Sequence, residues 1–221
     1  MPKRIVEAYI GEYASGKSEV AVNRALQLAR LGRRVNLVDL DIVEPCYTLR
    51  PIKRKLRDLG IDVLAWETRE TMGLGEAGNI LRPGNRWALR RPGDVILDIG
   101  YGVEGAKTLH LLEGAETDPD LKVLAVINIA RPVTGSLPDI IAYVRELGRV
   151  DGLINNSHLG DETTVEFVQE GAAVVTAAAR ELNLPVAATT VLAGLAREIG
   201  PQDAVGNPVW PITRYMPETF W

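Results

Sequence analysis

A stretch of eight residues near the N-terminus has the residue types and the spacing needed to hold an oligophosphate. It reads Gly11-Glu12-Tyr13-Ala14-Ser15-Gly16-Lys17-Ser18 and matches the pattern G-x-x-x-x-G-K-[ST] in full. Gly11 and Gly16 allow backbone angles and a close approach that a Cβ would prevent, so the N–H groups of the loop can point inward at an anion. Lys17 would supply charge to the β- and γ-phosphates, and the hydroxyl of Ser18 would bind Mg²⁺. These residues predict a binding loop for a nucleoside triphosphate with Mg²⁺.

Two apolar runs that end in aspartate supply further groups for a metal. Asp39 and Asp41 end the first run, Asn-Leu-Val-Asp-Leu-Asp. Asp98 lies near the end of the second run, Asp-Val-Ile-Leu-Asp-Ile-Gly. Open α/β sheets bind ligands at the carboxyl ends of their strands, and carboxylate oxygens suit Mg²⁺ either directly or through water. An aspartate at such a place can also cap a turn or a helix, but the adjacent phosphate-binding motif favours the metal site.

These residues need a scaffold of alternating strands and helices, which the hydrophobic pattern provides. Short apolar runs predict strands at residues 5–10, 34–38, 61–65, 94–99, 123–129, 152–155 and 186–190. Amphipathic stretches predict helices at residues 17–31, 49–59, 137–147 and 164–182. Because the strands are apolar throughout, helices should cover both faces of a mostly parallel sheet. We therefore predict a three-layer α/β/α P-loop NTPase fold.

The chain length predicts a single nucleotide-binding domain over residues 1–221. With 46% hydrophobic residues, the chain can bury a sizeable core. Residues at about 70–92 are rich in Gly, Arg and Pro and show no clear periodicity, which predicts an irregular loop or lid. Residues at about 200–221 are rich in Pro and Trp, which predicts an extended C-terminal strap.

Composition also argues against several classes of partner. The net charge of −4 gives no electrostatic footprint for nucleic acid. No apolar run approaches the roughly 18 residues that a membrane span needs. The only cysteine, Cys46, excludes an intrachain disulfide and is typical of a reducing compartment. We expect a cytoplasmic protein with no nucleic-acid or membrane partner.

Four segments together resemble the MinD/ParA/CobQ branch of the SIMIBI class of P-loop ATPases. They are the phosphate-binding loop, the Leu-Val-Asp-Leu-Asp strand end, the Ile-Leu-Asp-Ile-Gly strand, and Gly152-Leu-Ile-Asn-Asn156. The matches span about residues 5–190 and are weak over residues 42–93. The motif Gly-Glu-x-x-Ser-Gly-Lys-Ser-Glu is most similar to the corresponding motif of small bacterial ATP-binding proteins of this group.

The resemblance implies ATP as the nucleotide, Mg²⁺ as the metal and a role for each site residue. Ser18 would bind Mg²⁺, with Asp39 and Asp98 around the metal. Asp41 would orient the attacking water. The catalytic residues would then be Lys17 and Asp41.

Further nucleotide contacts also follow from the resemblance. Asn156 would read the adenine base, and Gly100 or Gly102 would contact the γ-phosphate. The remaining implied contacts are Glu12, Tyr13, Ala14 and Ser15 of the loop and the adjacent Glu19. ATP is expected rather than GTP on the resemblance, since no N-K-x-D guanine motif occurs in the chain. The D-x-x-G spacing of many γ-phosphate sensors is also absent after Asp98.

The chain departs from this branch at Glu12, where MinD and ParA carry a lysine that reaches the partner's nucleotide across a dimer. A carboxylate there would repel phosphate. A lysine-bridged dimer is therefore not expected, although another homodimer or a protein partner is possible. The proline-rich tail also has no counterpart of the membrane-targeting helix of MinD.

Three functions fit these residues. The first is slow ATP hydrolysis that acts as a nucleotide-controlled switch. The second is a small-molecule kinase or ATP-dependent ligase, as in CobQ and dethiobiotin synthetase, with residues 72–92 as the acceptor site. The third is a regulatory module that binds nucleotide without hydrolysis. We favour the switch.

His158, two residues beyond Asn156, stays open between a nucleotide contact, a catalytic base and a structural role. His110 is expected to be structural, and Cys46 an inert small residue rather than a nucleophile.

Overall fold

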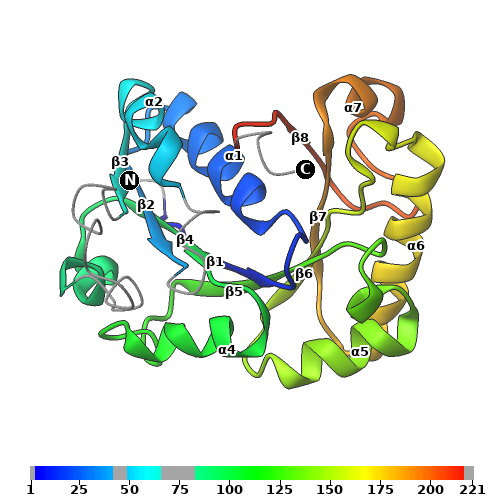
Figure 1. Cartoon of the computed structure of the whole chain (residues 1–221), viewed down its shortest axis with the longest axis horizontal. Helices are drawn as coiled ribbons and strands as arrows, with labels where there is room; N and C mark the ends of the chain where they lie inside the picture. The colour runs from blue at the N-terminus through cyan, green and yellow to red at the C-terminus, as the bar shows by residue number, and fades with distance from the viewer. Residues whose placement is uncertain (1–2, 42–48, 66–82, 217–221) are drawn as a thin grey trace.

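A parallel sheet of eight strands forms the centre of the molecule (Figure 1). The computed structural model describes residues 3–41, 49–65 and 83–216. The strands are β1 (Val6–Gly11), β2 (Val35–Leu40), β3 (Ile61–Leu64), β4 (Asp94–Ile99), β5 (Leu121–Ile127), β6 (Gly152–Asn155), β7 (Val186–Leu192) and β8 (Val209–Ile212). Their order is β3-β2-β4-β1-β5-β6-β7-β8, and each neighbouring pair is parallel. β1 therefore lies between β4 and β5, and its following loop lies at the middle of one sheet edge.

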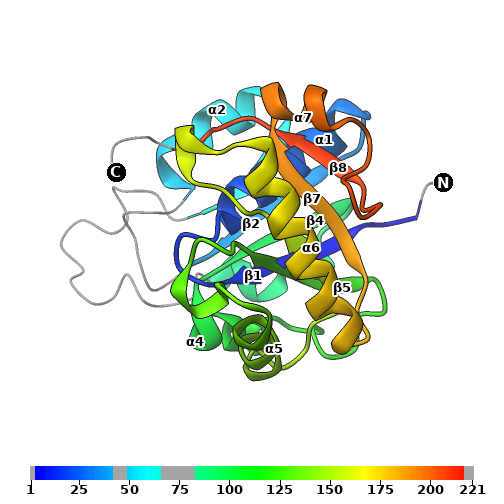
Figure 2. The same cartoon turned by 90° about the vertical axis from the view of Figure 1, so that its right-hand side faces the viewer.

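Helices cover both faces of this sheet (Figures 1 and 2). One face carries α1 (Lys17–Arg30) and α2 (Lys53–Asp58). The other carries α4 (Gly102–Lys107), α5 (Leu137–Glu146) and α6 (Val165–Glu181), while α7 (Ala193–Ile199) packs beside β7 and β8. Short 3₁₀ segments occupy Arg50–Ile52, Pro83–Arg90, Thr108–Leu111, Pro132–Thr134 and Gly160–Glu162. This arrangement confirms the predicted three-layer fold.

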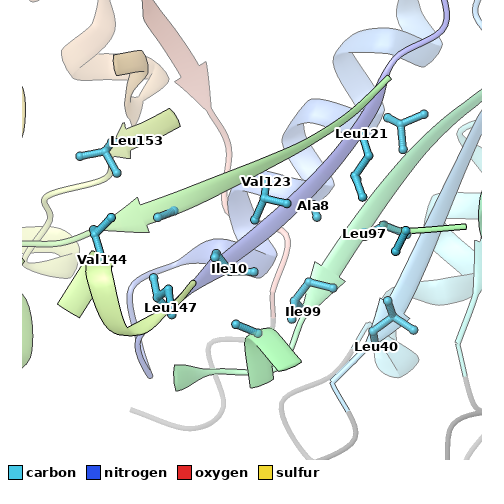
Figure 3. Packing of buried hydrophobic residues seen from close by; sticks show 14 of the residues in the cluster. Ala8, Ile10, Leu40, Leu97, Ile99, Leu121, Val123, Val144, Leu147 and Leu153 are labelled. Carbon is cyan, nitrogen blue, oxygen red and sulfur yellow. The ribbon is translucent and has the colours of Figure 1, made fainter. Parts of the chain in front are cut away.

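Alternate strand residues feed two hydrophobic clusters, one on each face. Figure 3 shows the cluster in which Ile10 and Leu97 of the sheet share a core with Val144 of α5. The neighbouring residues Tyr9 and Ile96 belong to the opposite cluster, beneath α1. Every residue of β1, β2 and β4 is buried. Strands covered on both sides need apolar side chains at successive positions, and the sequence supplies them.

The predicted strands and helices are present within the described residues, with corrections at some boundaries. β5 spans Leu121–Ile127, two residues earlier than predicted, because the chain turns at Asn128. α4, α7 and β8 were not predicted. α4 and α7 are only six and seven residues long and contain glycine, so their hydrophobic periodicity is weak.

The predicted strap and lid are only partly covered by the structure. Of the strap, Val209–Ile212 forms β8, which extends the sheet beside β7 despite Pro211. Proline is tolerated there because β8 is an edge strand. Of the lid, residues 70–82 lie outside the described residues, and Pro83–Arg90 is a 3₁₀ segment rather than an irregular loop. Within the described ranges, no helix has the length and apolar character required to cross a bilayer.

A glycine pair tests the packing of α4 against the end of β4. A Cβ on Gly105 of α4 would lie 2.0 Å from the carbonyl oxygen of Gly100, whereas a Cβ on Gly194 of α7 would meet no atom within 4 Å. We expect Gly105→Ala to lower the free energy of unfolding by about 1–3 kcal/mol or more through overpacking. Gly194→Ala, the matched control, should be neutral or stabilise by roughly 0.5–1 kcal/mol. Denaturant unfolding measures both, and equal effects would contradict the packing described.

Candidate functional site

The loop between β1 and α1 keeps its shape through two close approaches. Gly16 has a left-handed φ of 85°, and a Cβ added there would lie 2.2 Å from Nδ2 of Asn156. A Cβ added to Gly11 would lie 2.6 Å from the carbonyl oxygen of Val126. Both distances are too short for a real side-chain carbon, so only glycine fits at either position. The spacing of the motif thus reflects a steric demand of this fold.

The middle of the same loop bends through Ala14, which is left-handed at a φ of 53° although it carries a Cβ. This conformation costs about 1–2 kcal/mol, and such strain is concentrated at ligand-binding sites. The N–H of Ser15 donates to the carbonyl of Glu12 at 3.1 Å and closes the turn. α1 begins at Lys17, so its unpaired N–H groups and its positive end adjoin the loop. Backbone N–H groups at a turn before a helix N-terminus can form an anion-binding nest.

Asn156 connects the loop to the far strands of the sheet. Its Nδ2 donates to the carbonyl of Ser15 at 2.6 Å, and its Oδ1 accepts from the hydroxyl of Thr190 at 2.7 Å. The neighbouring Asn155 is instead buried against α6 and β7, where its Nδ2 donates to the carbonyl of Val168. Of the two asparagines, Asn156 therefore lies at the loop between β1 and α1. Its reading of a base stays a prediction.

Lys17 lies beneath an aromatic pair. Its side chain is buried, and Nζ lies 5.8 Å from the centre of the Tyr101 ring, a cation–π contact. Tyr101 also packs edge-on against Tyr13, with the ring centres 5.5 Å apart. Tyr101 directly follows β4 and Tyr13 lies in the phosphate-binding loop. The loops after β1 and β4 therefore touch each other through these two rings, and Tyr101 also contacts the lysine.

Asp98 is a buried carboxylate at the end of β4. Neither of its oxygens makes a hydrogen bond of ordinary geometry in the described part of the chain, although the Ser18 hydroxyl lies near enough to lower its pKa. Burial raises the pKa of Asp98 to about 8, with the charge of Asp39 adding to the effect and that of Lys17 opposing it. A buried charge without a compensating partner is costly. This position is therefore suited to a cation or to a water bound to one.

The chemistry of the donor set fits Mg²⁺. Within the described ranges, no group of three His, Cys, Asp or Glu side chains could hold a metal by itself. Ser18 lies close enough to Asp98 to oppose the rise in the pKa of Asp98. Mg²⁺ usually takes one or two protein ligands, with phosphate oxygens and water completing its shell. Ser18 and Asp98 could hold it in that manner together with a nucleotide.

The other two aspartates shape the chain after β2. Asp39 accepts from the backbone N–H of Asp41 at 3.1 Å and from that of Leu49 at 3.2 Å. Asp41 is buried, and a Cβ added to Gly100 would lie 3.3 Å from its Oδ1. The structure thus brings Asp41 to the loop after β4. Gly102, with a φ of 70°, begins α4 directly after that loop.

The side chains of Glu12 and Glu19, both predicted to contact the nucleotide, bond to the protein backbone instead. Oε1 of Glu12 accepts from the N–H of Tyr13. The two carboxylate oxygens of Glu19 accept from the N–H groups of Tyr215 and Met216 at 2.6 and 3.1 Å. Burial raises the pKa of Glu19. Glu19 therefore holds the C-terminal segment against α1 through its side chain, and only its backbone is left for a phosphate contact.

Sequence reasoning missed Tyr101, Thr190 and the C-terminal segment as parts of this site. Tyr101 could have been suspected, because it directly follows the Ile-Leu-Asp-Ile-Gly strand. For the C-terminal segment, the spacing of Glu19 and Asn23 on one face of α1 was a weak signal. Asn23 exchanges two hydrogen bonds with the backbone of Thr213.

Comparison with known proteins places the fold in a class. No family model matches the chain, and no curated protein sequence matches it. Among solved structures it is similar to cell division protein FtsY from Thermotoga maritima, with 19% identity and a TM-score of 0.56, covering 86% of this chain and 63% of that one. It is also similar to the signal recognition particle receptor FtsY from Elizabethkingia anophelis, with 16% identity and a TM-score of 0.54, covering 86% of this chain and 59% of that one. A third similar structure is FlhF complexed with GTP and Mg²⁺, with 12% identity and a TM-score of 0.54, covering 83% of this chain and 64% of that one.

These likenesses show an α/β fold of the P-loop NTPase type, similar to that of FtsY and FlhF. Membership of the MinD/ParA/CobQ branch, which the sequence motifs resemble, stays a prediction. The chain spans less than two thirds of the length of each of these three structures.

The unpartnered carboxylate of Asp98 has a measurable effect on stability when Mg²⁺ and nucleotide are absent. Its pKa is about 8 in the folded protein and near 3.8 when unfolded, so between these values the folded state binds more protons. Stability should then fall as the pH rises from about 4 to 8, by at most about 1.4 kcal/mol per pH unit. Asp98→Asn removes the titrating group and should be more stable than wild type at pH 8.

Denaturant unfolding at pH 5 and pH 8 in a chelating buffer measures this difference. Asp58→Asn, at an exposed position of α2, is the matched control and should not alter the pH dependence. Loss of stability in Asp98→Asn at pH 8 would contradict the account.

Proposed function

We propose that this protein is a nucleotide-controlled switch that binds ATP with Mg²⁺ and hydrolyses it slowly. The observation that carries the proposal is the buried Lys17 at the start of α1, beside a glycine-enforced nest and the unpartnered Asp98. The nest would bind the phosphates through backbone N–H groups. Lys17 would neutralise their charge, and Ser18 and Asp98 would hold the metal.

A switch needs the nucleotide to control loop conformation, and the contacts around Lys17 support this. The Tyr101 ring lies against the ammonium group that would bind the β- and γ-phosphates. Asp41, which directly follows β2, lies beside Gly100, which directly follows β4. A γ-phosphate near Lys17 would therefore act directly on the segments after β2 and β4. Asp41 would orient the attacking water, so that hydrolysis and loop conformation depend on the same groups.

ATP is proposed over GTP on the chemistry of the base end of the site. Guanine presents N–H donors on its Watson–Crick edge, which a carboxylate can read. Leu159, the third residue after Asn156, has no carboxylate with which to read guanine. The nearby carboxylate of Asp161 is paired with Arg214 at 2.8 Å. GTP is nevertheless the necessary comparison, because FlhF was solved with GTP and Mg²⁺ and one FtsY structure with GDP.

Two variants separate binding from hydrolysis. Lys17→Ala should weaken binding of ATP about tenfold or more, because a buried charge-assisted contact with phosphate is lost. Asp41→Asn should bind ATP like wild type but release phosphate on the order of 10²-fold more slowly, because the water loses its proton acceptor. Calorimetry with ATP and GTP and a phosphate-release assay measure these effects. Lys122→Ala and Asp58→Asn, both exposed, are the matched controls.

The result also separates the alternatives. Phosphate release by Asp41→Asn at the wild-type rate would contradict the role of Asp41. If wild type binds ATP but releases phosphate only with an added metabolite, the kinase or ligase function replaces the switch. If no phosphate is released under any condition, the protein is a binding module. Failure to bind any nucleotide would contradict all three.

A further inference from the structure

His158 presents its imidazole to the phosphate-binding loop from a rigid segment. The N–H of His158 donates to Oδ1 of Asn128, and Nδ2 of Asn128 donates back to the carbonyl of His158, both at 3.2 Å. The preceding Asn156 is fixed by donation of its N–H to the carbonyl of Ile127 at 2.7 Å. A Cβ added to Gly16 would lie 3.5 Å from Nε2 of His158. The ring therefore lies beside Asn156, against the same glycine.

The hydrogen bonds of this ring determine which nitrogen carries the proton. Nδ1 accepts from the N–H of Gly160 at 3.4 Å, so in the neutral ring the proton is on Nε2. Burial, followed by the charges of Arg131 and Arg214, lowers the pKa of His158 to about 4. Near neutral pH the side chain is thus an uncharged group with a single donor, and that donor is on the Gly16 side.

The position beside Gly16 determines which part of a nucleotide would meet this donor. Gly16 directly precedes Lys17, so the donor lies on the phosphate side of any base bound near Asn156. In a nucleotide with the usual anti base, the edge of a purine that carries N7 is the one nearest the 5′-phosphate. N7 is an acceptor in both adenine and guanine. Pyrimidines have no such atom.

The outer side of this region is bounded by the C-terminal segment. Arg214 pairs with Asp161 at 2.8 Å, and Glu19 holds Tyr215 through a hydrogen bond of 2.6 Å. The segment therefore joins the loop after His158 to α1, next to the phosphate-binding loop. A base held next to Asn156 and His158 would therefore lie near this segment.

We propose that His158 donates a hydrogen bond from Nε2 to N7 of a purine nucleotide held on residues 11–18. The inference rests on the proposed nucleotide binding and adds a residue that selects purines over pyrimidines without separating adenine from guanine. Because its imidazole is uncharged, His158 is better suited to donate to a neutral ring nitrogen than to bind an anionic second substrate. Discrimination between ATP and GTP is left to other groups.

The test compares ATP with 7-deaza-ATP, in which a C–H replaces N7, by calorimetry with Mg²⁺ at neutral pH. Wild type should bind 7-deaza-ATP about fivefold more weakly, since one neutral hydrogen bond is lost and its donor is left unpaired. His158→Ala should weaken ATP about fivefold and bind both compounds equally. His158→Gln, which keeps a side-chain N–H donor, should restore part of the preference. Inorganic tripolyphosphate should bind wild type and both variants alike.

His110→Ala is the matched control, because His110 is an exposed histidine in the 3₁₀ segment before β5 and lies at the surface, 3.4 Å from Glu116. Equal binding of the two compounds by wild type would overturn the inference while leaving the proposed function intact. An equal loss of tripolyphosphate and ATP binding in His158→Ala would also overturn it, because the residue would then act by shaping the loop. If wild type binds neither ATP nor tripolyphosphate, the proposed function itself fails.

Discussion

The hydrogen bond from the Asn156 amide to the Ser15 carbonyl fixes the loop on which the proposed function depends. It ties the segment after β1, at the centre of the sheet, to β6 and, through Thr190, to β7. Because this amide reaches the backbone, Gly16 cannot carry a Cβ. The left-handed turns at Ala14 and Gly16 are then held in place, so the N–H groups need little reorganisation to meet an anion. Pre-organisation of this kind lowers the cost of binding.

Two buried ionisable side chains, Asp98 and Lys17, lie beside this loop. Both lie at the carboxyl edge of the sheet, and the carboxylate makes no hydrogen bond of ordinary geometry within the described ranges. Burial raises the pKa of Asp98 to about 8, so the side chain is largely protonated near neutral pH while no cation is bound, and a bound cation would favour its ionised form. Phosphate with Mg²⁺ satisfies both groups at once. Tyr101, which directly follows β4, lies near Lys17, and Asp41, which directly follows β2, lies beside Gly100.

The sequence predicted much of the fold, because strands buried on both sides must be apolar at successive positions. The loop and its lysine were also predictable, since the steric demands on Gly11 and Gly16 leave a fixed spacing. Asp39, Asp41 and Asp98 followed from their places at strand ends. The docking of Tyr215 on Glu19 was not predictable, because the two residues lie 196 positions apart. β8 was missed because it contains Pro211, and α7 because it has only seven residues and contains glycine. Tyr101 was missed because an aromatic residue after a strand has no fixed role.

The central claim is that the backbone N–H groups of the loop between Gly11 and Ser18 bind the phosphates of a nucleotide. Amide NMR spectra of the labelled protein, recorded with Mg²⁺ before and after addition of ATP, test this residue by residue. The account predicts that the largest shifts fall on residues 12–19, with smaller changes at the ends of β2 and β4. Spectra that do not change, or changes confined to a distant surface, would contradict it.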